Sequence, residues 1–240
     1  MKFGTPIKLA PGLMVMWGDR SSCIAPHKKN FLDLFLAASQ EKLAAYNLTS
    51  LWYLEQEHTA EGVILFGDIP PGVQVLNDIG DYLITNVANA GIGVTTADCL
   101  PIIFYDPEHR ALAVAHAGWK GSVQGITPIT LRQMQQRFGS SLDKIQIWFG
   151  PHALPCCYEV TEEFRVHILS SIADQVLQSR DGRLYFNTAH YNELLLTAAG
   201  IESRQIDRQY SLCTMCNSRF HSRRNDGAMY VGQSSIAWLI

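Results

Sequence analysis

The chain has 240 residues, of which 47% are hydrophobic and 17% charged, and its net charge is −3. This composition is typical of a globular protein with a large core, and it lacks the basic surplus of proteins that bind nucleic acids. The N-terminal residues lack the uninterrupted apolar stretch typical of a secretory signal, so we expect none, and no run of about 18 apolar residues predicts a membrane span. We therefore expect a cytoplasmic protein, not bound to a membrane, whose partner is a small molecule.

The sequence pattern predicts short strands and helices that alternate along the chain. Apolar runs predict strands at 13–17, 51–54, 63–66, 81–85, 100–105, 111–115, 145–149 and around Ile206, and residues 91–96 lead into the run at 100–105. Periodic apolar residues and capping residues predict helices at 30–46, 122–138, 161–178 and 187–199. The helix at 30–46 has Asn30 as its cap, and Asp181-Gly182 ends the helix at 161–178. Residues 68–81 are rich in Pro, Gly, Asn and Asp, which predicts an exposed loop.

The runs 100–105 and 111–115 are joined by a short polar connection and predict a hairpin of two buried strands. With the turn centred between Pro107 and Glu108, Cys99 and His116 face each other at the open end. Directly opposed residues of an antiparallel pair have Cα atoms about 4.5–5.5 Å apart. The two side chains are then close enough to touch or to share a metal ion. A buried cysteine that acts only as a small apolar side chain is the alternative.

Polar and small residues surround this pair and favour a functional site over a core position. Asp98 precedes the cysteine, and Gly118-Trp119 follows the histidine, with Trp119 as a candidate wall. His58 follows a predicted strand and is a candidate ligand, although surface histidines are common there. Arg20 lies in a polar loop and is either solvated or a clamp for an anion.

The segment 213–227 is the second region rich in reactive side chains. Cys213, Cys216 and His221 offer a CxxC motif plus a histidine, but a fourth ligand and a partner CxxC are missing for structural zinc. Six cysteines are too few for a disulfide scaffold in a chain of this length. The neighbouring cysteines 156 and 157 cannot both point one way, so one of them is expected in the core. Arginines 219, 223 and 224 form the densest positive cluster, either solvated or ready for a phosphate or carboxylate.

Several ordered motifs together resemble the laccase-domain family, which is also described as a polyphenol oxidase, purine nucleoside phosphorylase or peptidoglycan editing factor family. The motifs are Ala-Asp-Cys at 97–99, His-Ala-Gly-Trp at 116–119, Gly-Pro at 150–151, Cys-Tyr-Glu-Val at 157–160, and Cys-Thr at 213–214 with Ser-Arg-Arg-Asn-Asp-Gly at 222–227. The resemblance implies an α/β (α+β) fold with mixed central β-sheets flanked by helices, in a single domain spanning residues 1–240.

The resemblance also implies the site residues. It implies His58, Cys99 and His116 as metal ligands, with Cys99, His116 and Asp98 as the catalytic residues. Arg20, Gln56, Arg223 and Arg224 are implied for binding substrate and phosphate. The chain departs from the family pattern in two places: Gln56-Glu57-His58-Thr59 stands where the family has Gln-Val-His-Gly, and Ser222 stands where it has Tyr. Two histidines, one cysteine and an open fourth position are the ligand set of catalytic zinc.

This resemblance implies a zinc-dependent purine nucleoside phosphorylase acting on adenosine and inosine, with adenosine deamination as a second reaction and nucleoside and phosphate as ligands. An editing amidase of cell-wall precursors, with Cys99 as a nucleophile activated by His116, is the alternative. A multicopper oxidase fits less well, because the eight histidines include no His-x-His pair. A single copper ion could still bind the site in vitro. A binding module whose site has decayed is the remaining alternative.

Overall fold

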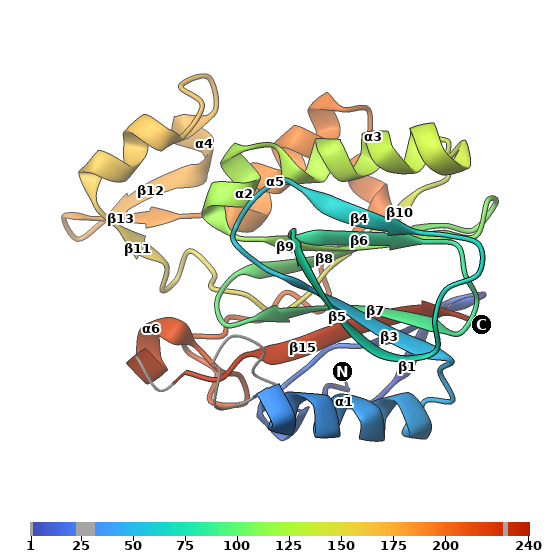
Figure 1. Ribbon diagram of the computed structural model, residues 1–240. Helices are drawn as coiled ribbons and strands as arrows, with labels where there is room; N and C mark the ends of the chain where they lie inside the picture. Colours follow the sequence, from blue (N-terminus) through green and yellow to red (C-terminus); the bar gives the residue numbers. More distant parts are fainter. Residues whose placement is uncertain (1, 23–31, 228–229) are drawn as a thin grey trace.

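The computed structural model describes residues 2–22, 32–227 and 230–240 of the chain. Two six-stranded mixed sheets lie face to face, with helices on their outer sides (Figure 1). Helix α1 (Leu32–Ala45) covers the first sheet, and α3 (Ile126–Phe138) and α5 (Thr188–Ala198) cover the second. The predicted fold class is confirmed. The predicted cap Asn30 lies outside the described residues.

Alternating side chains of the strands fill both faces of each sheet. In the first sheet, Leu51 and Tyr53 belong to the cluster that packs on α1, whereas Trp52 and Leu54 belong to the cluster between the two sheets. A third cluster lies between the second sheet and its helices. Strands buried on both faces explain the continuous apolar runs of the sequence.

The first sheet contains several strands that the sequence did not predict, among them Ile7–Ala10, Gly72–Ile79 and Gln233–Leu239. Its order is β1 (Ile7–Ala10), β2 (Leu13–Met16), β15 (Gln233–Leu239), β7 (Ala90–Thr96), β3 (Ser50–Glu55) and β5 (Gly72–Ile79). Strand β5 pairs in parallel with β3, so the predicted loop at 68–81 is wrong for most of its length. The strand lies at the edge of the sheet with Asp78 and Ile79 exposed, which gives its sequence a loop-like polarity.

The second sheet contains the predicted hairpin. Its order is β14 (Ile206–Asp207), β10 (Gln146–Phe149), β8 (Leu100–Asp106), β9 (Ala111–Ala117), β6 (Tyr82–Thr85) and β4 (Gly62–Leu65). The hairpin β8–β9 is confirmed and buried throughout. Its register differs from the prediction, because Pro101, not Cys99, pairs with His116.

The register is set by the turn at 107–110. Asp106 is buried, and its carboxylate accepts hydrogen bonds from the backbone N–H groups of Glu108 and His109 and from the His109 ring, at 2.9, 3.3 and 2.8 Å. Arg110 closes the turn with a left-handed φ of 49°. The turn is therefore centred one residue further along the chain than predicted, and Cys99 lies just outside the ladder.

Two predicted helices are broken in the structure. The one at 122–138 is divided by Gly125, whose φ of 84° ends α2 (Trp119–Val123) before α3 begins. The one at 161–178 is wrong: this segment forms the 3₁₀ helix η2 (Glu162–His167), the single turn α4 (Ala173–Val176) and then strand β12 (Leu177–Arg180). The helix α5 is confirmed, and the Asn187 side chain caps it by accepting a 3.0 Å hydrogen bond from the His190 N–H.

A third, small sheet explains the failed helix prediction. It has the order β11 (Glu159–Val160), β13 (Arg183–Phe186) and β12. Asp181 and Gly182, with φ of 51° and 71°, form the tight turn between β12 and β13. An Asp-Gly pair with positive φ is typical of a two-residue hairpin turn.

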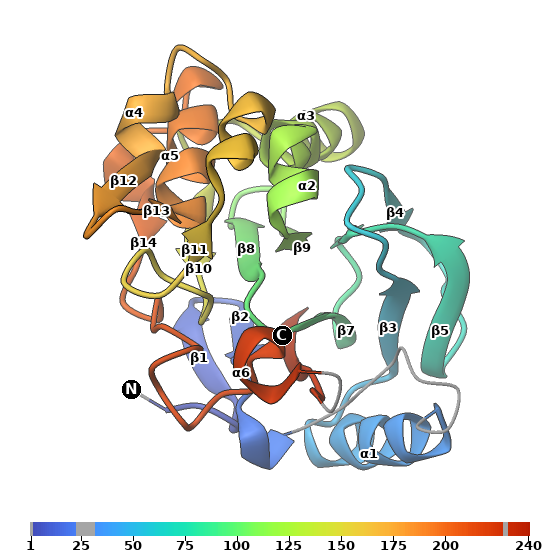
Figure 2. The ribbon, with the colours of Figure 1, turned by 90° about the vertical axis from the view of Figure 1, so that its left-hand side faces the viewer.

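The small sheet and helix α6 (Arg223–Asp226) lie on the same side of the two large sheets, as Figure 2 shows. The remaining short elements are η1 (Arg20–Ser22) and η3 (Ser203–Gln205). Within the described residues, no helix combines the length and apolar character that crossing a membrane requires.

Candidate metal centre

Three side chains from separate parts of the chain converge beside the hairpin. His58 follows β3, Cys99 immediately precedes β8, and His116 belongs to β9. One donor atom from each lies within 4.8 Å of the other two. The Cys99 Sγ is 3.7 Å from the His58 Nε2, and the two imidazole rings meet edge to face with centroids 4.8 Å apart. We call these residues the His-Cys-His triad.

Asp81 fixes two members of the triad. One of its carboxylate oxygens accepts a hydrogen bond from His116 Nδ1 at 2.6 Å and another from the His58 N–H at 3.1 Å. The other oxygen accepts bonds from the Thr59 N–H and hydroxyl, at 2.6 and 2.9 Å. Because this bond holds a proton on Nδ1 of His116, Nε2 is the nitrogen that a metal ion can bind when it displaces the second ring proton.

Sequence reasoning missed Asp81, although a signal for it exists. Strands β6 and β9 are antiparallel with Tyr82 opposite Ala115, which sets Asp81 opposite His116. The His116 N–H also donates to the Asp81 carbonyl at 2.7 Å. Placing Asp81 beside His116 requires knowing that β6 pairs with β9, and the apolar periodicity within each strand does not show this pairing.

The triad favours a thiolate. Burial raises the pKa of Cys99, but the charge and hydrogen bond of His116, followed by those of His58, lower it to about 6. Burial lowers the pKa of His116, but the charge of Cys99 and the Asp81 hydrogen bond raise it to about 10. The thiolate is the form of cysteine that binds metal ions and attacks electrophiles.

The local backbone is shaped to bring the triad together. His58 and Asp98 both adopt left-handed conformations, with φ of 60° and 87°, which are uncommon for residues other than glycine. A Cβ atom at Gly118 would lie 2.6 Å from His58 Cδ2 and 3.1 Å from Cys99 Sγ. A glycine at this position therefore gives the two ligands the space they need.

The hydrogen bonds of the Asp98 carboxylate go to residues outside the triad. Its carboxylate accepts bonds from the Thr214 hydroxyl at 2.7 Å, the Ser222 hydroxyl at 3.0 Å and the Arg224 N–H at 2.9 Å. These contacts tie the loop that carries Cys99 to the segment around α6. These contacts are those of a residue that positions the loop, and the catalytic role implied for Asp98 by the resemblance stays a prediction.

A cavity of about 460 Å³ lies between the small sheet and α6. It is lined by aromatic, charged and polar side chains: Trp119, Tyr158, Glu159, Val160, Thr161, Glu163, Phe164, His167 and Arg224. Trp119 is adjacent in sequence to Gly118, which contacts the triad. The pKa of Tyr158 is raised by burial and by the charge of Cys99, and the charge of Arg224 opposes this. Tyr158 therefore lies close to both the triad and the cavity.

Of the four residues predicted to bind substrate or phosphate, Arg224 is the one that lines the cavity. Arg20 forms a bidentate ion pair with Asp226 at 2.9 and 3.0 Å, and Arg223 lies over the ring of Tyr230. Gln56 is buried and bonds both the N–H and the carbonyl of Thr95, at 2.7 and 2.9 Å. The Gln56 side chain therefore links the end of β3 to β7.

The donor set of the triad fits a metal ion. Two imidazole nitrogens and one thiolate are ligands for Zn²⁺ or Cu²⁺, and a hydrogen bond that the far N–H of a ligand histidine donates to a carboxylate is the usual outer support. Three protein ligands leave one position of a tetrahedral ion open, as in catalytic centres.

Comparison with known proteins gives related enzymes and the same fold. A purine nucleoside phosphorylase of Clostridium acetobutylicum is 32% identical over 76% of this chain and 74% of its own length. An adenosine deaminase from an unknown prokaryotic organism is 32% identical over 63% of this chain and 61% of its own. The hypothetical protein YfiH of Bacillus licheniformis superposes with a TM-score of 0.82 at 22% identity, covering 99% of this chain and all of that one.

The match covers less than two thirds of some relatives, down to 42% of the human and mouse purine nucleoside phosphorylases. The family model described as "Multi-copper polyphenol oxidoreductase laccase" matches residues 35–239, which include the triad, Asp81 and all the residues that line the cavity. With the fold, the ordered motifs and this match in agreement, the chain belongs to the multi-copper polyphenol oxidoreductase laccase family.

Proposed function

We propose that this protein is a zinc-dependent enzyme of purine nucleosides, with phosphorylase activity on adenosine and inosine and deaminase activity on adenosine. The observation that carries the proposal is the His-Cys-His triad beside a cavity with aromatic walls and one arginine. The names of the relatives support the substrate class.

In this proposal the triad holds the zinc ion, with Asp81 keeping His116 in the correct tautomer. Bound zinc supplies a water with a pKa lowered to about 7, which suits hydrolytic deamination at neutral pH. Trp119 and Tyr158 provide flat apolar surfaces for a purine base. Arg224 lines the same cavity and binds the phosphate that phosphorolysis requires, since guanidinium groups match phosphate oxygens in pairs.

The test measures metal content together with products. The parent chain is purified without a polyhistidine tag and compared with Cys99→Ala for zinc, for ammonia from adenosine, and for free base and ribose 1-phosphate in the presence of phosphate. We expect the variant to lose the triad zinc and both activities. A zinc-loaded parent that makes neither ammonia nor free base would refute the purine nucleoside proposal.

Phosphorolysis is tested separately at the cavity. Arg224→Gln is expected to raise the KM for phosphate about 10- to 100-fold, because hydrogen bonds to charged groups contribute about 1.5–3 kcal/mol. Deamination, which uses no phosphate, should change far less. Arg223→Gln is the matched control, because Arg223 is the neighbouring arginine and does not line the cavity.

A second candidate is an amidase that uses Cys99 as nucleophile and no metal. It is favoured by the lowered pKa of Cys99, about 6, beside His116. Iodoacetamide distinguishes the two: a free thiolate is alkylated at once, whereas a metal-bound thiolate is protected until a chelator is added. Fast alkylation of metal-free, folded protein, together with release of an amino acid from cell-wall precursors, would support the amidase.

Two further candidates are outcomes of the same measurements. Oxidation of phenols after copper loading would support a copper oxidase, which the family description suggests. Normal folding with neither metal nor activity would indicate a binding module.

A further inference from the structure

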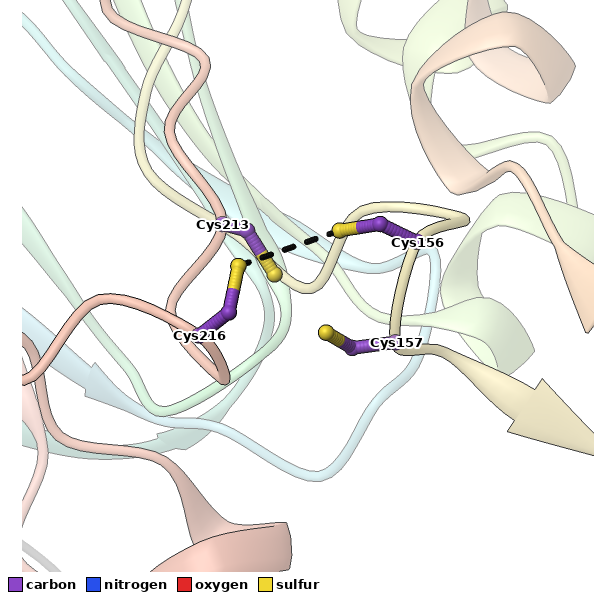
Figure 3. Close-up of side chains that lie close together, drawn as sticks. All are labelled: Cys156, Cys157, Cys213 and Cys216. Atoms are coloured by element: carbon purple, nitrogen blue, oxygen red, sulfur yellow. Dashed lines mark hydrogen bonds between the residues drawn. The ribbon is translucent and has the colours of Figure 1, made fainter.

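Two pairs of cysteines far apart in sequence converge at a second place, distinct from the triad. Cys156 and Cys157 come from the loop between β10 and β11, and Cys213 and Cys216 come from the segment between β14 and α6 (Figure 3). All four sulfur atoms lie within 4.8 Å of one another, and none is in a disulfide. We call them the four-cysteine cluster.

The backbone of the two loops holds this arrangement without help from the sulfur atoms. The His152 N–H donates to the Leu212 carbonyl and the Thr214 N–H donates to the His152 carbonyl, each at 3.0 Å. This short parallel bridge sets Cys213 beside the start of the loop that carries Cys156 and Cys157. The cluster is therefore framed by the fold on both sides.

The prediction that one of the adjacent cysteines belongs to the core is wrong. The N–H groups of Cys157 and Tyr158 both donate to the Leu154 carbonyl at 2.9 Å, so residues 154–158 form a turn. On this turn both neighbouring thiols point into the cluster, which an extended strand does not allow (Figure 3). Cys156 is exposed and Cys157 is half-buried.

The sulfur spacing fits a metal ion and not a disulfide. A tetrahedral zinc ion with Zn–S distances of about 2.3 Å separates its sulfur atoms by about 3.8 Å. The Sγ atoms of Cys156 and Cys216 are 3.9 Å apart, whereas a disulfide requires about 2.05 Å. Backbone hydrogen bonds from Leu154, Met215 and Cys216 reach the Cys213 sulfur, the outer support that thiolate ligands commonly have.

We propose that Cys156, Cys157, Cys213 and Cys216 bind one structural Zn²⁺ ion. Four thiolates complete the coordination of zinc and leave no position for a substrate, so the site is closed. The missing partner of the CxxC motif is the adjacent pair of cysteines about 60 residues earlier in the chain. His221 is not among the side chains whose donor atoms converge here, and its Nδ1 contacts Arg20 and Asp226.

The ion would join two segments that form the rim of the cavity. The first segment continues into Tyr158, which lines the cavity, and the second continues into α6, which carries Arg224. The Arg224 Nη1 donates to the Glu159 carbonyl at 2.7 Å, and Asn225 donates to the Met215 carbonyl at 2.5 Å, so the rim is tied directly to both loops. The ion thus positions the cavity wall and does not act on substrate.

The experiment counts zinc in three proteins made under reducing conditions without a polyhistidine tag: the parent, Cys99→Ala, and the double variant Cys156→Ser/Cys216→Ser. We expect about two zinc ions per chain in the parent and about one in each variant. Each variant removes ligands from one cluster only, so the two sites are counted independently of any enzyme activity.

Cobalt gives the ligand set. Cys99→Ala loaded with Co²⁺ keeps all four cysteines, and it should show the intense thiolate-to-cobalt charge transfer and the ligand-field bands of a tetrahedral four-sulfur site. X-ray absorption of the same variant loaded with zinc should fit four sulfur atoms at about 2.3 Å. These measurements on Cys99→Ala also test the four-cysteine site if the double serine variant fails to fold.

Three results would overturn the proposal. The first is a Cys99→Ala protein without metal in which the thiols of all four cluster cysteines are free, and the second is a pair of disulfides among these cysteines in reduced cell extracts. The third is iron in place of zinc. A zinc-loaded parent protein that has no nucleoside activity, while Cys99→Ala shows the four-sulfur signature, would refute the proposed function and leave this site standing.

Discussion

The two cysteine-containing clusters of this protein differ in number of ligands and in surroundings. The His-Cys-His triad offers three donors, two of them imidazoles, on strands and loops framed by the large sheets. The four-cysteine cluster offers four thiols on two loops, one between β10 and β11 and the other between β14 and α6. Three donors leave a metal ion open to a substrate, whereas four donors close it.

The groups that support the two clusters also differ. A buried carboxylate, Asp81, sets the tautomer of His116 in the triad. The cavity lined by Trp119 and Tyr158 lies close to the triad. The four-cysteine cluster is supported by backbone hydrogen bonds and by the bridge between His152 and Cys213. The comparison suggests that one cluster is built for reactivity and the other for holding the cavity wall.

Removing one cysteine from each cluster breaks this comparison most directly. Cys99→Ala should lower activity by more than about 100-fold, since loss of outer support alone typically costs 10- to 100-fold. Its melting temperature should stay near that of the parent. Cys216→Ser should lower the melting temperature by about 10 °C or more, because about 1 kcal/mol corresponds to about 2–4 °C for a chain of this size. Calorimetry and assays on the same samples check both. Equal melting temperatures for the two variants would contradict the assignment of separate roles.

Replacing the supporting carboxylate tests the triad more finely. Asp81→Asn removes the charge that holds His116 Nδ1–H, and we expect zinc affinity at the triad to fall about 10- to 100-fold. Competition with a coloured chelator measures the affinity.

The hairpin supplies a matched control for this variant. Asp106 is also buried and also accepts a hydrogen bond from a histidine, His109, at 2.8 Å, but it lies at the opposite end of β8 from the triad. Asp106→Asn should lower stability without changing zinc affinity. If both variants lose zinc equally, the effect of Asp81 is only structural.

Filling the space between the ligands His58 and Cys99 should have a smaller effect on zinc affinity. Gly118 has φ −68° and ψ 164°, a conformation that alanine adopts without strain. The added methyl group of Gly118→Ala therefore acts only through its contacts with His58 and Cys99, at 2.6 and 3.1 Å before relaxation. We expect triad zinc affinity to fall about tenfold, within the range of lost outer support, with the four-cysteine zinc retained. Unchanged triad affinity would show that His58 can move aside.

Local signals in the sequence predicted the hairpin β8–β9 and helix α5, because each has its own apolar pattern and turn or cap residues. They missed what depends on distant pairing. The register of the hairpin depends on the hydrogen bonds of Asp106, and the place of Asp81 depends on β6 lying beside β9. The Asp-Gly pair at 181–182 was interpreted as a helix end, although the same pair is typical of a hairpin turn.

The same limit explains the two metal clusters. Cys99 and His116 were predicted as partners because one hairpin joins them, and the prediction survived a shift in register because Cys99 lies in the loop at the same end. The four-cysteine cluster was not predicted, because its halves meet only when β10 and β14 lie side by side. A CxxC motif gives no indication of which distant cysteines complete it.

Acid sensitivity gives the last contrast, between His116 in the triad and His152 beside the four-cysteine cluster. His152 is fully buried, and its Nδ1 donates to the Gly150 carbonyl at 2.9 Å. Burial lowers its pKa to about 4, and the hydrogen bond to Gly150 opposes this only in part. His152 is therefore neutral in the folded protein, whereas a metal-free His116 is protonated.

The sign of the effect follows from proton binding. Below pH 6.5 the unfolded chain protonates His152 and the folded protein does not, so stability falls as the pH drops from about 6.5 to about 4. Between pH 6.5 and pH 5 this amounts to about 2 kcal/mol, from 1.36 kcal/mol per pH unit. Urea unfolding at both pH values should show this loss in the parent. His152→Asn, which keeps a donor for Gly150 but does not titrate, should lose about 2 kcal/mol less than the parent does. An identical pH dependence in the variant would mean that His152 is protonated in the folded protein, and the loops that carry the four-cysteine cluster would then contain a buried charge.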